Sequence, residues 1–290
     1  MRIERVGVIG GGQMGAGIAE VAASRGCDVI VHEISAGACD AARSRVERSL
    51  ERAVTKSKLD EDQRDAIISR IGYSIDIDEQ ADRQVVIEAV TEDEGLKREI
   101  FRTLDGVLGS DEAILASNTS SIPITRLATV TDRPEQVIGL HFFNPVPVMA
   151  LVELVATPLS DPGVEARAEE FVGDQLGKTV IRAKDRGGFV VNLLLVPYLL
   201  GAVRMYEAGH ATAADIDMGM RLGANHPMGP LELCDFIGLD TMKLVADVLF
   251  DEYKEPLYAP PPLLTRLVEA GKLGRKTGQG FYHYDSPDAE

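Results

Sequence analysis

The sequence lacks several kinds of residue, and each absence narrows the class of protein. It contains no tryptophan and only three cysteines (Cys27, Cys39 and Cys234), which form no C-x-x-C pair and no even-numbered framework. We therefore expect small buried thiols in a reducing compartment rather than disulfides. A strand begins near Ile3, which leaves no room for a leader, so a cytoplasmic location is expected. No H-E-x-x-H or similar spacing is present, and no metal is expected.

Positive charge and long apolar runs are also scarce. Thirty lysines and arginines face 46 aspartates and glutamates, for a net charge of −16. This charge argues against nucleic acid or an anionic membrane surface as a partner, because both would be repelled. The apolar run from Phe189 to Val203 contains Asn192 and Pro197. It is shorter than the about 20 residues that a membrane-spanning helix needs, so it favours a buried or subunit-interface helix.

The stretch Val6–Gly17, VGVIGGGQMGAG, contains the most informative motif, G-x-G-x-x-G. Gly10 allows a sharp turn out of a strand, Gly12 leaves room for a pyrophosphate, and Gly15 allows the next helix to pack closely on the sheet. The helix N-terminus then faces the phosphates. Glu33, at the end of the next apolar run, is placed to bind the adenosine ribose. The predicted cofactor contacts in this motif are Gly10, Gly12, Gln13, Met14 and Gly15.

A helical pair follows Glu33 where one crossover helix would be ordinary. The pattern predicts helices over 36–54 and 60–71, an arm inserted before the next strand near 73–75. From Ala41 to Lys58 six cations face two acids. Arg48, Arg52 and Lys56 share one helix face. This face is either simply solvated or a surface for a large anionic ligand.

Polar groups gather where the later strands are expected to end. Gln84–Val90 reads as a buried strand, and 92–108 as a helix with an acidic first turn. The strand 113–117 runs into Ser117-Asn118-Thr119-Ser120-Ser121, at the edge where open α/β sheets bind ligands. The strand 136–140 leads to His141, and a short proline-containing connection leads to a strand with Glu153. His141 and Glu153 can therefore lie side by side on neighbouring strands, although a lone histidine is more often a satisfied core residue.

A polar run, Lys184 to Gly188, predicts the boundary between two domains. Residues 1–185 are expected to form an α/β, Rossmann-like domain that binds the dinucleotide. Residues 186–290 are expected to be all-helical, with helices over 189–208, 212–222, 230–251 and 263–270.

These residues predict a reaction. A nicotinamide cofactor performs hydride chemistry, so the protein must supply a base for the alcohol proton and donors for the reacting oxygen. His141, oriented by Glu153, suits the base, and Ser120 and Asn192 suit the donors. The residues therefore favour an NAD-dependent alcohol dehydrogenase whose substrate has a large anionic group. Glu33 favours NAD over NADP, because its charge would repel a 2′-phosphate and no arginine follows it closely.

Six segments resemble, in order, the L-3-hydroxyacyl-CoA dehydrogenase family. They are VIGGGQMGAGIA, ILASNTSS, GLHFFNPVPVM-LVELV, GGFVVN-LLVPYL, LGANHPMGPLEL-D-IGLD and KLGRKTGQGFY. The chain is most similar to the stand-alone bacterial branch that acts on 3-hydroxybutyryl-CoA. The resemblance implies NAD as cofactor, an acyl-CoA substrate in fatty-acid metabolism, and a homodimer formed through the helical domain, with the acyl group between the domains.

The resemblance also implies roles for individual residues. His141 matches the catalytic base, Glu153 its partner, and Ser120 and Asn192 the residues at the substrate oxygen. Glu33 matches the ribose-binding acid. Three residues match the surroundings of the nicotinamide half of the cofactor: Glu92, Lys97 and Asn144. Ser49 and Lys56, on one face of the arm, match contacts to coenzyme A.

The chain departs from the family pattern at Leu193 and Ala150, where arginine and lysine are frequent, and at Gly11 and Gln13. The departures affect the expected acyl-chain preference rather than the base. Two alternatives stay open at this point. One is a dehydrogenase of a free hydroxy or sugar acid, which would not need the cationic arm. The other is a non-catalytic NADH-binding protein, which would not need His141 and its neighbours.

Overall fold

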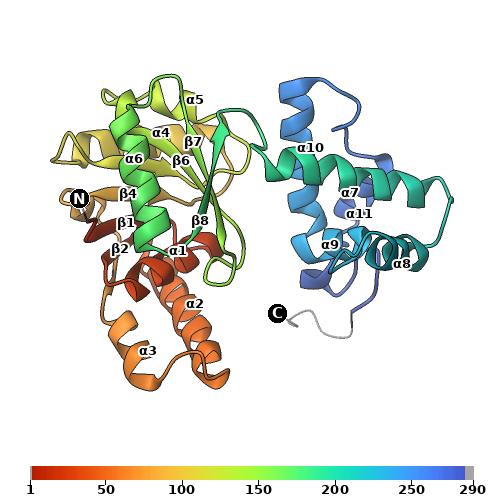
Figure 1. Cartoon of the computed structure of the whole chain (residues 1–290), viewed down its shortest axis with the longest axis horizontal. Coiled ribbons are helices and arrows are strands. Elements are labelled where there is room, and N and C mark those ends of the chain that lie inside the picture. Colours follow the sequence, from red (N-terminus) through yellow and green to blue (C-terminus); the bar gives the residue numbers. More distant parts are fainter. Residues whose placement is uncertain (1, 285–290) are drawn as a thin grey trace. The chain divides into compact units, whose positions relative to one another are not determined.

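The computed structural model describes residues 2–284 and contains two compact units (Figure 1). The division falls between Arg186 and Gly187, inside the polar, glycine-containing run. The first unit holds every strand of the main sheet, and the second holds five α-helices. Among residues 2–284 no helix combines the length and the apolar character that crossing a bilayer requires.

The first unit is built on one eight-stranded sheet in the order β3-β2-β1-β4-β5-β6-β7-β8. Every neighbouring pair is parallel except β6 and β7. The central strands β4, β5 and β6 are buried along their whole length, which explains their continuous apolar runs. The strands are β1 (Arg5–Ile9), β2 (Asp28–His32), β3 (Ile71–Ser74), β4 (Val85–Glu88), β5 (Ile114–Ser117), β6 (Val137–Phe142), β7 (Leu151–Ala156) and β8 (Thr179–Lys184).

The helices of the first unit connect the strands and provide the arm. α2 and α3 pack on each other and extend beyond the sheet as the arm (Figure 1). Asp60 and Gln63 form a capping box at the start of α3. The helices are α1 (Gln13–Ser24), α2 (Ala36–Thr55), α3 (Glu61–Ile68), α4 (Glu94–Val107), α5 (Ile124–Ala128) and α6 (Pro162–Glu170).

Three predicted bounds in this unit are wrong, each for a local reason. β3 starts at Ile71 and ends at Ser74, because Ile71 pairs with Val29 of β2. α4 starts at Glu94, because Asp93 caps it by accepting from the Leu96 N–H at 2.7 Å. The sequence pattern predicts one helix over 163–176, but α6 ends at Glu170 and a π-helical turn, Phe171–Gln175, follows it.

The second unit is all-helical apart from isolated bridges near its end. The predicted single helix over 230–251 is two helices. Gly238 has a φ of +99°, which no α-helix contains, so it ends one helix and precedes the next. The second unit has its own buried core, which includes Leu199, Leu231 and Leu249. The helices are α7 (Val191–Glu207), α8 (Ala213–Gly223), α9 (Pro230–Ile237), α10 (Leu239–Tyr253) and α11 (Pro262–Glu269). The predicted fold class, a Rossmann-like sheet domain followed by a helical domain, is confirmed.

Candidate active site

The glycine turn joins β1 to α1 at the carboxyl edge of the sheet. Gly10 has a φ of +90°, a conformation that favours glycine. A Cβ at Gly15 would lie 1.7 Å from the Gly10 carbonyl oxygen, so only glycine lets α1 approach this closely. A Cβ at Gly12, the N-cap of α1, would meet nothing within 4 Å. The space in front of the helix N-terminus therefore fits a dinucleotide phosphate, and these residues could hold the cofactor.

Glu33 follows β2 beside the turn. Its Oε1 accepts from the Gly11 N–H at 2.7 Å, and its Oε2 accepts from the Ile34 N–H at 3.3 Å. Gln13 is exposed and Met14 half-buried at the first turn of α1. The structure thus gathers Glu33 and the predicted glycine-turn residues at one end of β1 and β2.

His141 and Glu153 face each other across the antiparallel strands β6 and β7. The ladder pairs the two residues directly, and His141 Nδ1 lies 2.6 Å from Glu153 Oε2. His141 is 4% exposed and Glu153 is fully buried. With the proton on Nδ1 donated to the carboxylate, Nε2 is the basic atom of the ring.

Ser120 lies at the other side of the His141 ring. Its Oγ is 3.2 Å from His141 Nε2, which connects serine, imidazole and carboxylate in one line of hydrogen bonds. The Phe143 ring packs against the imidazole, with ring centroids 4.6 Å apart. Asn118 Oδ1 accepts from the Phe142 N–H at 2.8 Å and ties the Ser120 loop to β6. The arrangement can accept a proton at Nε2 from a hydroxyl held near Ser120.

Glu92 holds the loop that carries Ser120. Its Oε1 accepts four hydrogen bonds, from Thr119 Oγ1 (2.6 Å), Ser120 N–H (2.9 Å), Ser121 N–H (3.1 Å) and Ser121 Oγ (2.9 Å). Because α4 starts only at Glu94, the Glu92 side chain is available for this loop. The sequence predicted Glu92 at the cofactor. In the structure it fixes the backbone around Ser120, and a direct cofactor contact stays a prediction.

Lys97 is almost completely buried, at 1% exposed. Its Nζ lies 2.6 Å from Glu88 Oε1, 3.3 Å from the Val90 carbonyl oxygen and 3.5 Å from Glu92 Oε2. Glu88, fully buried at the end of β4, also accepts from Ser117 Oγ at 2.6 Å. The sequence reasoning assigned no role to Glu88. The signal that could have found it is an acid at the end of an otherwise apolar strand.

The remaining predicted residues follow β6 or belong to α2 and α7. Asn144 is exposed just after β6. Asn192 is half-buried in the first turn of α7, in the second unit. Ser49 is half-buried on α2, and Lys56 is exposed at its C-cap. Burial raises the pKa of Glu20 on α1, while a hydrogen bond with Ser49 and the charge of Arg52 oppose that rise.

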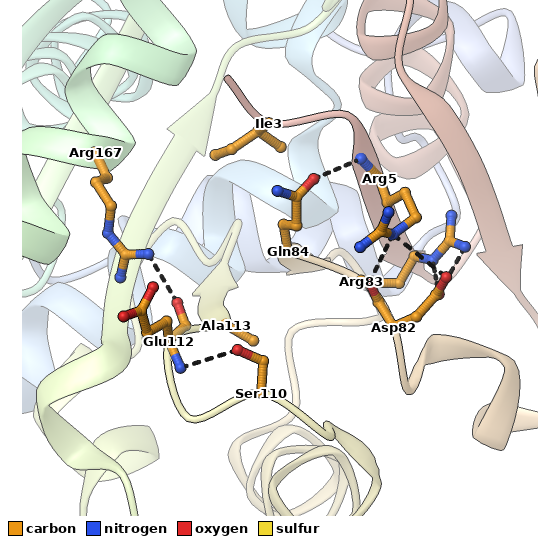
Figure 2. A pocket seen from close by; sticks show the side chains of 9 residues that line it. All are labelled: Ile3, Arg5, Asp82, Arg83, Gln84, Ser110, Glu112, Ala113 and Arg167. Atoms are coloured by element: carbon orange, nitrogen blue, oxygen red, sulfur yellow. Dashed lines mark hydrogen bonds and ion pairs between the residues drawn. The ribbon is translucent and has the colours of Figure 1, made fainter. Parts of the chain in front are cut away.

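A pocket of about 190 Å³ opens at the opposite edge of the sheet (Figure 2). It is bordered by the starts of β1, β4 and β5. Its polar groups pair with one another: Arg5 Nε donates to the Asp82 carbonyl at 2.9 Å, and Arg167 to the Glu112 carbonyl at 2.9 Å. It is therefore separate from the site at the carboxyl edge and has no comparable reactive pair.

Comparison with known proteins gives a consistent result over the whole chain. Residues 5–186 match the model of the 3-hydroxyacyl-CoA dehydrogenase NAD binding domain, and residues 188–284 match the C-terminal domain of the same family. The first match indicates NAD as the cofactor. The chain is 56% identical over 282 residues to a 3-hydroxybutyryl-CoA dehydrogenase of Mycobacterium tuberculosis, covering 97% of this chain and 99% of the relative.

Another relative and two solved structures match along nearly the same length. The human mitochondrial hydroxyacyl-coenzyme A dehydrogenase is 43% identical, with 97% of this chain and 91% of the relative covered. The crystal structure of M. tuberculosis FadB2 superposes with a TM-score of 0.97 at 56% identity, covering 98% of this chain and 100% of that one. The structure of (S)-3-hydroxybutyryl-CoA dehydrogenase PaaH1 from Ralstonia eutropha gives 0.92 at 45% identity, with 98% and 100% covered.

Proposed function

The chain belongs to the 3-hydroxyacyl-CoA dehydrogenase family, and from this premise we propose that it interconverts (S)-3-hydroxybutyryl-CoA and acetoacetyl-CoA with NAD. The observation that carries the proposal is the line from Glu153 through His141 to Ser120, with contacts of 2.6 Å and 3.2 Å. A purely nucleotide-binding protein has no use for this line. The names of the 3-hydroxybutyryl-CoA dehydrogenases that resemble the chain support the four-carbon substrate.

In the oxidative direction His141 is the general base. Its Nε2 accepts the proton of the substrate hydroxyl, and the buried carboxylate of Glu153 stabilises the imidazolium that forms. Bound NAD supplies the hydride acceptor. Ser120 positions the reacting oxygen at Nε2, and Glu92 fixes Ser120 through the backbone. Asn192 is proposed, on the family resemblance, as a second donor to that oxygen.

The arm is proposed to bind the coenzyme A part of the substrate. Lys56 and Ser49 lie one above the other on α2, seven residues apart. Arg48 and Arg52 extend the same cationic face, and all three cations are exposed. Phosphate groups are bound well by such a cluster. The proposal explains a local positive surface on a chain with a net charge of −16.

The second unit is proposed to form a homodimer. Several large apolar side chains of α7 and α8 are exposed, including Leu194 (72%), Met205 (45%), Met218 (51%) and Leu222 (80%). Such a concentration is typical of a subunit interface.

A cytoplasmic location is also proposed, supported by three buried cysteines that are free thiols.

The substitution His141→Gln tests the reaction. Glutamine retains an N–H donor for Glu153 but cannot accept a proton at neutral pH. We expect kcat for acetoacetyl-CoA reduction, followed by NADH absorbance, to fall at least about 100-fold, with the NADH Kd unchanged. His210→Ala, at an exposed histidine of the second unit, is the control.

The outcomes separate the alternatives. Near-normal turnover in His141→Gln would contradict the assignment of the base. In the wild-type protein, activity on free hydroxy acids but not on thioesters would select the sugar-acid alternative. NADH binding without turnover of either class would select the non-catalytic one.

A further inference from the structure

Arg45 of α2 contacts the glycine turn. Its Nη1 donates to the Gly11 carbonyl oxygen at 3.2 Å, while the Gly11 N–H donates to Glu33 Oε1 at 2.7 Å. The two polar groups of one residue in the phosphate-binding turn are therefore held by side chains of opposite charge. The sequence placed Arg45 only among the cations of the arm. Arg45 is twelve residues after Glu33, so the two side chains are not neighbours in the sequence.

Close packing of α2 brings Arg45 to the turn. A Cβ at Gly11 would lie only 2.3 Å from the Ala42 Cβ and 3.4 Å from Glu33 Oε1. Ala42 is fully buried and lies one helical turn before Arg45. The small residues Gly11 and Ala42 thus allow the helix to reach the turn, and the helix carries the guanidinium with it.

Most of the hydrogen-bonding capacity of Arg45 is unused. The side chain is exposed and forms no ion pair with any acid in residues 2–284. Its single hydrogen bond within that range goes to Gly11, whereas a guanidinium has five N–H donors. Arginine binds phosphate oxygens well, because its planar fork matches two of them at once. The nearest feature built to receive such oxygens is the turn that Arg45 already contacts.

We propose that Arg45 is a nucleotide-binding residue that donates to a phosphate oxygen of the bound dinucleotide. The proposal rests on the NAD site proposed above, to which it adds a charged contact from the arm. The phosphate oxygen belongs either to the diphosphate, which NAD and NADP share, or to the 2′-phosphate of NADP. In the second case Arg45 offsets the repulsion from Glu33 and lets the site accept NADPH as well.

The experiment measures binding without acyl-CoA and without turnover. Dissociation constants of NADH, NADPH and ADP-ribose are determined by calorimetry for the wild type, Arg45→Gln and Arg102→Gln. Arg102→Gln is the matched control, because it removes the same charge from an exposed position of α4 that belongs to neither proposed binding surface. We expect Arg45→Gln to raise Kd about five- to tenfold for at least one nucleotide, as loss of a charge-assisted hydrogen bond does.

The pattern among the nucleotides identifies the phosphate. Weaker binding of all three supports a contact with the diphosphate, and weaker binding of NADPH alone supports a contact with the 2′-phosphate. Changes no larger than those of Arg102→Gln overturn the proposal. If the wild type binds none of the three, the NAD site itself fails, which is a different result.

Salt dependence separates a phosphate contact from a role in holding Gly11. The Kd of the variant divided by the Kd of the wild type should decrease when NaCl is raised from about 20 mM to about 500 mM, because salt screens an exposed charge pair. A ratio that does not change with salt would mean that Arg45 acts only through the Gly11 carbonyl, and would overturn the proposal. Thermal unfolding without nucleotide shows whether Arg45→Gln is folded, and Arg45→Met, which also removes the charge, replaces it if it is not.

Discussion

The buried ion pair of Lys97 and Glu88 can be used to test how much this pair stabilises the site. The substitution Lys97→Met keeps most of the side-chain volume and removes the ammonium. The Glu88 carboxylate then stays buried with the Ser117 hydroxyl and the Val90 N–H as its remaining donors. Bulk solvent does not stabilise this carboxylate, because both side chains are at most 1% exposed.

The expected loss of unfolding free energy is large for a single substitution. Removing one partner of a buried ion pair costs about 3–5 kcal/mol, because the other charge is left without compensation. For a unit of this size that corresponds to a fall in melting temperature of about 6–20 °C. The double variant Glu88→Gln/Lys97→Met should recover part of this loss, since glutamine carries no charge and can still accept from Ser117.

Urea unfolding followed by circular dichroism measures the effect. Arg98→Met is the control, because Arg98 follows Lys97 directly and pairs with Glu94 at 3.5 Å on the same helix, where both side chains are partly exposed. An exposed pair of this kind contributes only about 0.3–0.5 kcal/mol. If Lys97→Met costs no more than Arg98→Met, the pair does not stabilise the site as argued. A drop in kcat without loss of stability would instead place Lys97 at the cofactor, as the family resemblance predicts.

Three further predictions concern separate parts of the chain. Lys56→Glu should raise KM for acetoacetyl-CoA several-fold with a smaller change in kcat, in steady-state assays; an unchanged KM would mean that the arm's charge is only solvated. Because burial raises the pKa of Glu20, the folded protein binds its proton more tightly than the unfolded chain does. The stability cost of that carboxylate is therefore absent below its ordinary pKa and grows as pH rises through the raised value. Glu20→Gln should accordingly stabilise the protein at pH 7 and have little effect near pH 4, measured by urea unfolding. Leu222→Glu should shift the protein from dimer to monomer in light scattering, and a wild type that is already monomeric would refute the proposed interface.

Local signals account for what the sequence could predict. The glycine turn could be predicted because its backbone conformation and close packing require glycine. The structure shows a positive φ at Gly10 and no room for a side chain at Gly15. The short connection between β6 and β7 leaves few ways to pair the strands, so His141 and Glu153 could be placed opposite each other in advance. Both inferences needed only neighbouring residues and the geometry of strands.

Contacts between distant parts of the chain were not predictable in this way. The bond from Arg45 to Gly11 depends on how α2 packs against the turn, and the four hydrogen bonds to Glu92 depend on where α4 begins. Similarly, the helical pattern continues through Gly238, whose backbone conformation breaks the helix. Apolar periodicity gives the type of an element, but capping groups and positive φ values set its ends.

The chain has a negative net charge, but its proposed binding surfaces are positively charged. The distance between a ligand and each charged group determines which charges affect its binding. At physiological salt a charge is screened beyond about 8 Å. Most of the 46 acids therefore have little effect on a phosphate at the glycine turn or on α2. Between Ala41 and Lys58 six cations against two acids leave a local excess of four positive charges. That excess is carried by the same helix whose Arg45 contacts the turn. One cationic helix can thus serve both anionic ligands of the proposed reaction, the dinucleotide near its middle and coenzyme A near its end.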